Sequence, residues 1–166
     1  MAEKTKEEKK NEKILKKLIS EEWIAFNFYE QMIYACVPEE RDTICDIFLK
    51  NRDDEKNDHY DKLVRFALEN GFDVPCKISD YEMYAEESIV KQFEKWAKGK
   101  DAKYYIEQAI KAEEDAIKSY TEVLNDDDVF ECIKRLVLDF YYDEMEHLGN
   151  LNTLLIAYSV SAKINF

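Results

Sequence analysis

Apolar residues recur every three or four positions in four long stretches of the chain, and polar residues bound each stretch. This spacing places apolar side chains on one face of a helix, so it predicts amphipathic helices rather than strands. A shorter helix is predicted between the second and third long ones. The predicted helices cover residues 11–36, 38–69, 79–98, 101–124 and 125–158. The pattern therefore predicts an all-α fold.

Start and stop signals support these boundaries. Pro38 suits the first turn of the second helix, and Asn70–Gly71 is typical of a helix end. The other predicted helix starts are a capping box at Ser79–Glu82, a cap at Asp101, and a cap at Asn125 or Asp126–Asp128.

The loop lengths predict how the helices are arranged. A few residues join the first helix to the second and the third to the fourth, so each pair should form an antiparallel hairpin. Residues 71–100 between the hairpins can cross the length of a helix of about 25 residues, which is roughly 38 Å. Two hairpins joined by one long crossover form a four-helix bundle.

Composition indicates a single helical domain. The 166 residues are 46% apolar and include only three Gly and two Pro. We expect a bundle domain over residues 12–158, a polar lysine-bearing tail over 1–11 and a second tail over 159–166. The four cysteines form no CxxC pair, and we expect reduced, mostly buried thiols. No membrane span or signal peptide is apparent, so a cytoplasmic location is predicted.

Charge is unevenly distributed along the chain. The first 17 residues contain seven Lys and four Glu, a charge of about +3. Because the whole chain carries −13, the remaining 149 residues carry about −16. Such a body attracts cations and repels phosphate. A lysine-bearing tail could contact DNA, but its glutamates dilute the positive field, and we favour a solvated tail.

Each apolar stripe also contains a glutamate near its middle, and two stripes add a histidine. The six residues are Glu22, Glu55, His59, Glu113, Glu144 and His147. Taken singly, a glutamate whose side chain reaches solvent or a hydrogen-bonded core histidine is an ordinary feature. Four buried carboxylates together need neutralising groups, because burying each bare charge is costly. Two divalent metal ions would balance them, whereas protonated carboxyls or internal water leave the histidines unexplained.

The second helix departs from regular Glu-x-x-His spacing. Lys56 occupies the position three before His59, and Glu55 lies four before it. A one-residue insertion is commonly absorbed as a π-bulge, so we expect Glu55 to share a face with His59. The alternative is a degraded site, with Asp58 or nothing in its place.

Four segments carry a family resemblance: LISEEWIAFNFYE, DDEKNDHYDKLVRFALENGFDVP, KAEEDAIKSYTEVLN and LDFYYDEMEHLGNL. Together they resemble the ferritin-like superfamily, and within it the Dps-like and bacterioferritin-like branches. The resemblance implies a ferritin-like four-helix bundle in which the six residues bind two iron ions. It also implies that Glu55 and Glu144 bridge the metals, while Glu22 and Glu113 are terminal ligands.

The resemblance implies an oxidoreductase that oxidises Fe(II) with O₂ or H₂O₂, for iron storage or peroxide removal. Two Fe ions are expected, the same ligands also suit Mn, and no haem is predicted. Storage would need a homo-oligomeric shell of 12 or 24 copies, and a dimer is the smaller alternative. Other interpretations remain: a rubrerythrin-like peroxidase, whose usual CxxC pair is missing; a di-metal catalase or oxygenase; and a structural or binding protein with a degraded site.

Tyr29 and Tyr120 lie seven residues after Glu22 and Glu113, on the same helical faces. Their hydroxyls could bond the ligating carboxylates, or the rings could pack in the core with the hydroxyls bonded elsewhere. Three neighbouring glutamates turn about 100° away and are expected on the solvated face. They are Glu21, Glu114 and Glu146.

Overall fold

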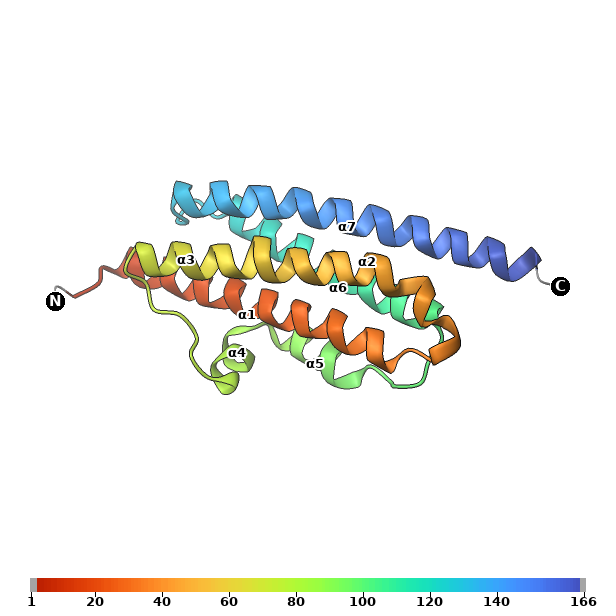
Figure 1. The fold of residues 1–166 in the computed structure, drawn as a ribbon. Coiled ribbons are helices and arrows are strands. Elements are labelled where there is room, and N and C mark those ends of the chain that lie inside the picture. Colours follow the sequence, from red (N-terminus) through yellow and green to blue (C-terminus); the bar gives the residue numbers. More distant parts are fainter. Residues whose placement is uncertain (1–2, 165–166) are drawn as a thin grey trace.

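Figure 1 shows the fold in a computed structural model that describes residues 3–164. Every regular element among these residues is helical. The elements are α1 (Lys6–Ala35), η1 (Pro38–Glu40), α2 (Arg41–Asp53), η2 (Asp54–Tyr60), α3 (Asp61–Glu69), α4 (Ile78–Tyr84), α5 (Glu87–Lys95), α6 (Ala102–Asn125) and α7 (Glu131–Ile164). The predicted all-α bundle with one long crossover is confirmed.

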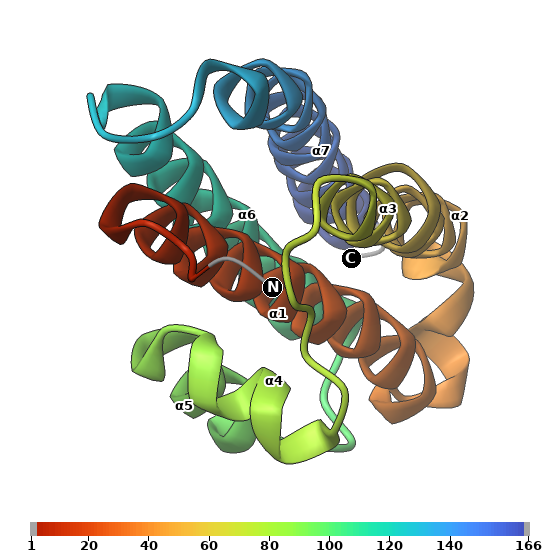
Figure 2. The ribbon, with the colours of Figure 1, turned by 90° about the vertical axis from the view of Figure 1, so that its left-hand side faces the viewer.

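The helices form two antiparallel hairpins. Elements α2, η2 and α3 follow one another without a break and make one rod beside α1, while α6 pairs with α7 (Figure 1). Viewed end-on, these four rods surround a common axis (Figure 2). The crossover helices α4 and α5 lie outside the bundle against α1.

Apolar side chains fill the bundle on both sides of its middle. One buried cluster includes Phe28, Met32, Phe48, Tyr105 and Leu151, and the other includes Leu15, Leu63, Tyr120, Ile133 and Phe140. Along α1, α6 and α7, the buried glutamates and histidine lie between these clusters. Dense apolar packing excludes water, so charges in the middle lie in a medium of low dielectric.

Helix α1 begins at Lys6, so the predicted start at Asn11 is wrong and residues 6–11 are helical rather than a tail. Thr5 is the cause. Its hydroxyl accepts the backbone N–H of Glu8 at 3.1 Å, and the Glu8 carboxylate accepts the backbone N–H of Thr5 at 2.7 Å. This capping box extends the helix towards the N-terminus. Residues 1–2 of the predicted tail lie outside the described residues.

Buried Asn11 fixes the turn before α7. Its side-chain amide donates to the backbone oxygen of Asp128 at 3.0 Å and accepts the backbone N–H of Phe130 at 2.8 Å. Helix α7 therefore begins at Glu131. The predicted caps at Asn125 or Asp126–Asp128 are wrong.

Helix α7 also continues past its predicted end at Tyr158, as far as Ile164. Residues 150–166 contain no Gly or Pro, so no helix-stopping residue is present. Residues 159–164 of the predicted tail are thus helical, and 165–166 lie outside the described residues. This final segment projects beyond the bundle (Figure 1).

The crossover contains two short helices, α4 and α5, where one was predicted over residues 79–98. The backbone is extended at Ala85 and Glu86 between them. The Glu86 carboxylate lies 2.5 Å from the Lys17 ammonium on α1. This ion pair holds the break against the bundle.

The predicted capping box at Ser79 is also wrong, because Ser79 lies inside α4. Asp80 satisfies the free backbone donors instead. Its carboxylate accepts the N–H groups of Cys76 at 3.2 Å and Lys77 at 3.1 Å. This arrangement starts α4 at Ile78.

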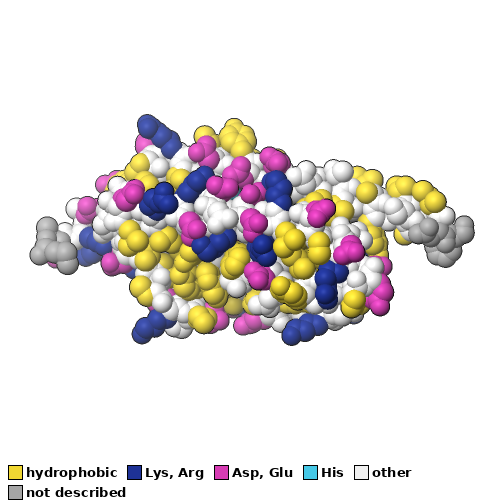
Figure 3. Space-filling model, in the orientation of Figure 1, with side chains coloured by type: hydrophobic (Ala, Val, Ile, Leu, Met, Phe, Trp, Pro, Cys, Tyr) yellow, Lys and Arg dark blue, Asp and Glu magenta, His cyan; other side chains and the backbone are white. Residues whose placement is uncertain are grey.

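The prediction of mostly buried thiols is wrong for two of the four cysteines. Cys36 is buried and Cys45 half-buried, whereas Cys76 and Cys132 are exposed; all four are free. Acidic and basic side chains interleave over the face shown in Figure 3, where no histidine is visible. Within residues 3–164, no helix is long and apolar enough to cross a membrane.

Candidate metal centre

All six predicted ligands meet in the middle of the bundle. Glu22 comes from α1 and Glu113 from α6, while η2 and α7 each contribute a glutamate and a histidine. None of the six is more than 3% exposed. The rigid helices therefore present four carboxyl groups and two imidazoles to one small interior volume.

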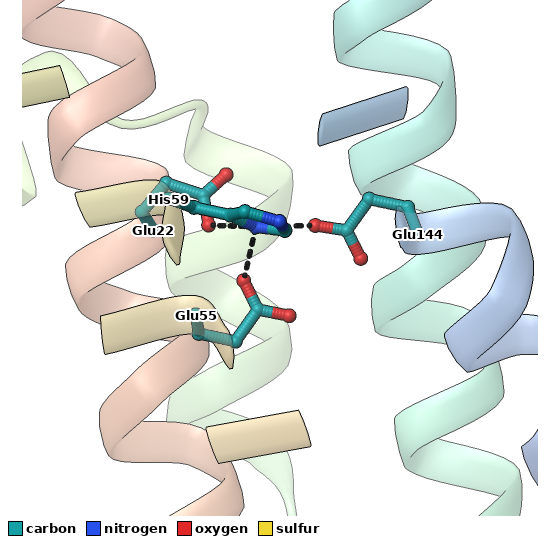
Figure 4. A group of neighbouring side chains, drawn as sticks. All are labelled: Glu22, Glu55, His59 and Glu144. Atoms are coloured by element: carbon teal, nitrogen blue, oxygen red, sulfur yellow. Dashed lines mark hydrogen bonds and ion pairs between the residues drawn. The ribbon is translucent and has the colours of Figure 1, made fainter. Parts of the chain in front are cut away.

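The six residues form two overlapping groups. Glu22, Glu55, His59 and Glu144 make the first, and Glu55, Glu113, Glu144 and His147 make the second. Within each group, one donor atom per residue lies within 4.8 Å of the others. Figure 4 shows the first group, with the His59 ring between Glu22 and Glu144. Glu55 and Glu144 belong to both groups.

A π-helical segment brings Glu55 and His59 together. Element η2 is a π-helix, as the four-residue spacing predicted, and both side chains are buried. Asp58 points away: its side chain is 52% exposed and lies 3.2 Å from the Lys62 ammonium. The alternative in which Asp58 replaces Glu55 therefore does not fit the structure.

Each histidine directs Nδ1 towards the carboxylates and Nε2 towards an aspartate of the other hairpin. His59 Nδ1 lies 3.2 Å from Glu22, Glu55 and Glu144. Its Nε2 lies 3.1 Å from Asp143. Such an outer hydrogen bond fixes the ring orientation and leaves the inner nitrogen to bind a metal.

His147 makes the equivalent contacts, with the roles of the two hairpins interchanged. Its Nδ1 lies 3.4 Å from Glu55 and from Glu144, and its Nε2 lies 3.0 Å from Asp54. Sequence reasoning missed both aspartates. The sequence does contain one indication of them, because each aspartate immediately precedes a candidate glutamate ligand in an Asp-Glu pair.

Without metal, protons neutralise this interior. Burial, followed by the charge of Glu55, raises the pKa of Glu22 well above its usual value. Burial, followed by the charge of Glu144, does the same to the pKa of Glu113. These two carboxyl groups therefore favour the neutral form.

The two shared glutamates behave differently. Burial acts to raise the pKa of Glu55, but its close contacts with Glu22, His147 and His59 outweigh burial, and the pKa is lowered. The proximity of Glu113, His147 and His59 likewise lowers the pKa of Glu144, against burial and the charge of Glu55.

Both histidines favour the charged form. Burial opposes it, but Glu22, Asp143 and Glu144 raise the pKa of His59, and Glu113, Glu144 and Glu55 raise that of His147. Two carboxylates thus balance two imidazolium ions. Metal ions would have to displace these protons.

Several donor atoms lack hydrogen-bond partners. Among the described residues, both carboxylate oxygens of Glu144 and Nδ1 of His147 are buried without one. Oxygen-rich donors with imidazole nitrogen suit Fe and Mn. The residues present therefore fit a pair of divalent ions.

The two candidate tyrosines differ. The Tyr29 hydroxyl donates to Glu113 and accepts from the Asn51 side-chain amide at 3.1 Å. Burial, followed by the charge of Glu113, raises the pKa of Tyr29 well above its usual value. The Tyr120 hydroxyl, in contrast, has no hydrogen-bond partner within residues 3–164.

Glu21 is buried rather than solvated, so that prediction is wrong; Glu114 and Glu146 are exposed. The Glu21 carboxylate accepts a hydrogen bond from the Ser119 hydroxyl at 2.8 Å. Burial raises the pKa of Glu21 to about 7, although the charge of Lys17 opposes the shift.

Comparisons with known proteins agree with this architecture. Residues 12–156 match the ferritin-like domain family. A dodecameric thioferritin, the bacterioferritin-related protein of Bacteroides fragilis, superposes with a TM-score of 0.80 at 17% identity, covering 93% of this chain and 89% of that one. Dps from Thermosynechococcus elongatus superposes with a TM-score of 0.76 at 14% identity, covering 90% and 92%.

At these identities, the solved structures establish a shared fold. A search of curated proteins found no significant match. The family match spans most of the chain and includes all or most of every helix of the bundle. This chain belongs to the ferritin-like domain family.

Proposed function

We propose that the protein is a ferroxidase, which oxidises Fe(II) with O₂ or H₂O₂ at a two-metal centre. One observation carries the proposal: two buried groups of donor atoms share Glu55 and Glu144. A shared carboxylate can bridge two ions and hold them close together. Two neighbouring Fe(II) ions can supply a pair of electrons to one oxidant.

In this proposal, Glu22 and His59 complete one metal position, and Glu113 and His147 complete the other. Four carboxylates balance the charge of two divalent ions, and the imidazoles bind as neutral ligands. Asp143 and Asp54 orient the rings through their Nε2 atoms.

The redox balance is simple for either oxidant. Two Fe(II) ions lose one electron each; with H₂O₂, the O–O bond breaks and two protons are taken up to give two waters. With O₂, the same two electrons and two protons give H₂O₂. Protons displaced when metals bind are available close to the centre.

The structure favours this function over its rivals. A degraded site would not be expected to bring all six donors together within the bundle, nor to leave Glu144 and His147 donor atoms unpaired. An oxygenase acting on an organic substrate needs a sizeable pocket, typically roughly 300 Å³ or more. The cavity beside the carboxylates measures about 40 Å³.

Iron storage is a further part of the proposal. One subunit cannot enclose a mineral, so storage requires a closed shell of copies. The structurally similar Bacteroides fragilis protein is described as dodecameric. A native mass measurement tests this point, and a monomer or dimer at micromolar concentration would exclude storage.

Metal stoichiometry and Fe(II) oxidation test the catalytic proposal. Under anaerobic conditions, wild type should bind two Co(II) ions per chain, Glu113→Ala should lose one position, and Glu55→Ala should lose both. Fe(II) oxidation by Glu113→Ala should fall by more than about a hundredfold, the upper range for changes outside the ligand set. Glu114→Ala, on the exposed side of α6, is the matched control. Equal oxidation rates in wild type and Glu113→Ala would remove the enzymatic function.

A further inference from the structure

A small cavity of about 40 Å³ lies beside the candidate ligands, between α1 and α6 and beneath α5. Its walls are mostly apolar, with Ala25 and Phe28 from α1, Ala112 and Ala116 from α6, and Ile89 from α5. All four candidate carboxylates also line it. A cavity of this size accommodates a few water-sized molecules.

The Tyr120 side chain lines this cavity, and its hydroxyl has no hydrogen-bond partner among the described residues. Tyr120 is 1% exposed, so bulk solvent does not satisfy the hydroxyl. Tyr29 lines the same cavity, but its hydroxyl is already bonded to Glu113 and Asn51. An unpaired buried hydroxyl is unfavourable, and phenylalanine would fill the same space without that cost. The unpaired group therefore points to a ligand in the cavity.

We propose that this cavity receives hydrogen peroxide, with the Tyr120 hydroxyl as its hydrogen-bond partner. This inference rests on the proposed ferroxidase function and names the oxidant. Hydrogen peroxide is small and neutral, and it both donates and accepts hydrogen bonds. Dioxygen is apolar and gains little from a hydroxyl. Tyr120 thus favours peroxide, whose O–O bond breaks as two Fe(II) ions give one electron each and two protons complete two waters.

Tyr120→Phe tests this assignment directly, because it removes one oxygen atom and keeps the shape of the ring. Protein loaded anaerobically with two Fe(II) ions per chain is mixed in a stopped-flow instrument with H₂O₂ or with O₂. Oxidation by H₂O₂ should slow by roughly five- to tenfold, the factor for one lost hydrogen bond. Oxidation by O₂ should change by less than about twofold. Tyr141→Phe, on α7 outside the cavity, should match wild type with both oxidants.

Two further measurements do not depend on activity. Zn(II) binding to Tyr120→Phe should remain at two ions per chain, because the hydroxyl is hydrogen-bonded to no candidate ligand among the described residues. The Tm of metal-free Tyr120→Phe should equal or exceed that of wild type, since an unpaired polar group has been removed. A clear fall in Tm would show that the hydroxyl is paired within the fold and would overturn the inference.

Filling the cavity provides an independent test. Ala116→Leu should slow oxidation by both oxidants, whereas Ala157→Leu, on the exposed face of α7, should not. Wild-type rates in Ala116→Leu would contradict access through this cavity. Wild-type H₂O₂ rates in Tyr120→Phe, or equal slowing with both oxidants, would overturn the role of Tyr120 and leave the ferroxidase function standing. Failure of wild type to bind two Zn(II) ions or to oxidise Fe(II) would overturn that function itself.

Discussion

The two hairpins carry the same chemistry on helices of different geometry. In the first, η2 places Glu55 four residues before His59 on a π-helix; in the second, α7 places Glu144 three residues before His147 on a regular α-helix. Both pairs nevertheless reach the same centre. The comparison shows that the protein absorbs an extra residue locally, without rotating the apolar faces of α2 and α3.

The hairpins are also interlocked by polar contacts. Each histidine is bonded to an aspartate of the other hairpin, and Tyr29 of the first donates to Glu113 of the second. Tyr120 of the second hairpin makes no equivalent contact, because its hydroxyl has no hydrogen-bond partner among the described residues. The centre is therefore assembled only when the hairpins dock, and its two halves are not equivalent.

The largest effect we expect is the contrast between two single-residue deletions, one in each hairpin: the first should be tolerated and the second should destabilise the fold. Removing exposed Asn57 should convert η2 to a regular helix with Glu-x-x-His spacing, because a π-bulge is one inserted residue. Removing exposed Met145 from α7 should rotate one half of that helix by about 100° and take core residues out of the bundle.

Urea unfolding and Co(II) titration measure the difference. The Asn57 deletion should change the free energy of unfolding by less than about 1 kcal/mol and still bind two ions. The Met145 deletion should cost more than about 3 kcal/mol, the range for several displaced core side chains. If the Asn57 deletion is as damaging as the Met145 deletion, η2 is not a locally absorbed insertion.

Much of this arrangement could be predicted from local spacing. The four long helices, the π-helix and the helical faces that carry the six side chains follow from residues three or four apart on one helix, and the two hairpins follow from the loop lengths. The start of α1 is equally local, because Thr5 and Glu8 form a capping box that their three-residue spacing already indicates. Helix periodicity and loop lengths therefore predict most of the fold.

Features that depend on how separate elements dock could not be predicted in this way. The bonds from His59 to Asp143 and from His147 to Asp54 require the relative placement of two hairpins. The burial of Glu21 depends on Ser119 of α6 and on the crossover that covers α1. A helical face alone does not reveal what lies across from it.

Glu21 is a further difference between the hairpins, because Ala112 occupies the equivalent position before Glu113. The folded-state pKa of Glu21 is about 7, raised by burial from 4.5. The folded protein holds this proton more tightly than the unfolded chain, so stability from this group is full below about pH 4.5 and is lost as pH rises to about 7. The loss amounts to about 3 kcal/mol at most.

Glu21→Gln should therefore stabilise the metal-free protein at pH 8 by up to about 3 kcal/mol and leave it nearly unchanged near pH 4.5. The amide oxygen can still accept the Ser119 hydroxyl. Chemical denaturation in the presence of a chelator at several pH values measures the difference from wild type. The same substitution at exposed Glu114 should leave the profile unaltered. If the free energies of unfolding of Glu21→Gln and wild type differ by the same amount at every pH, the raised pKa of Glu21 is contradicted.

The smallest effect is expected from substituting the two aspartates that contact a histidine of the opposite hairpin. Asp54→Asn should weaken the metal position that contains His147, and Asp143→Asn the position that contains His59, by about 10- to 100-fold in affinity. Each substitution removes the charge that orients an imidazole on the opposite hairpin. Anaerobic Co(II) titration measures both affinities, and Asp53→Asn, at an exposed neighbour, is the control. In a double variant with Glu22→Ala, Asp143→Asn should add little, because both act on one position; fully additive losses would show that this aspartate acts elsewhere.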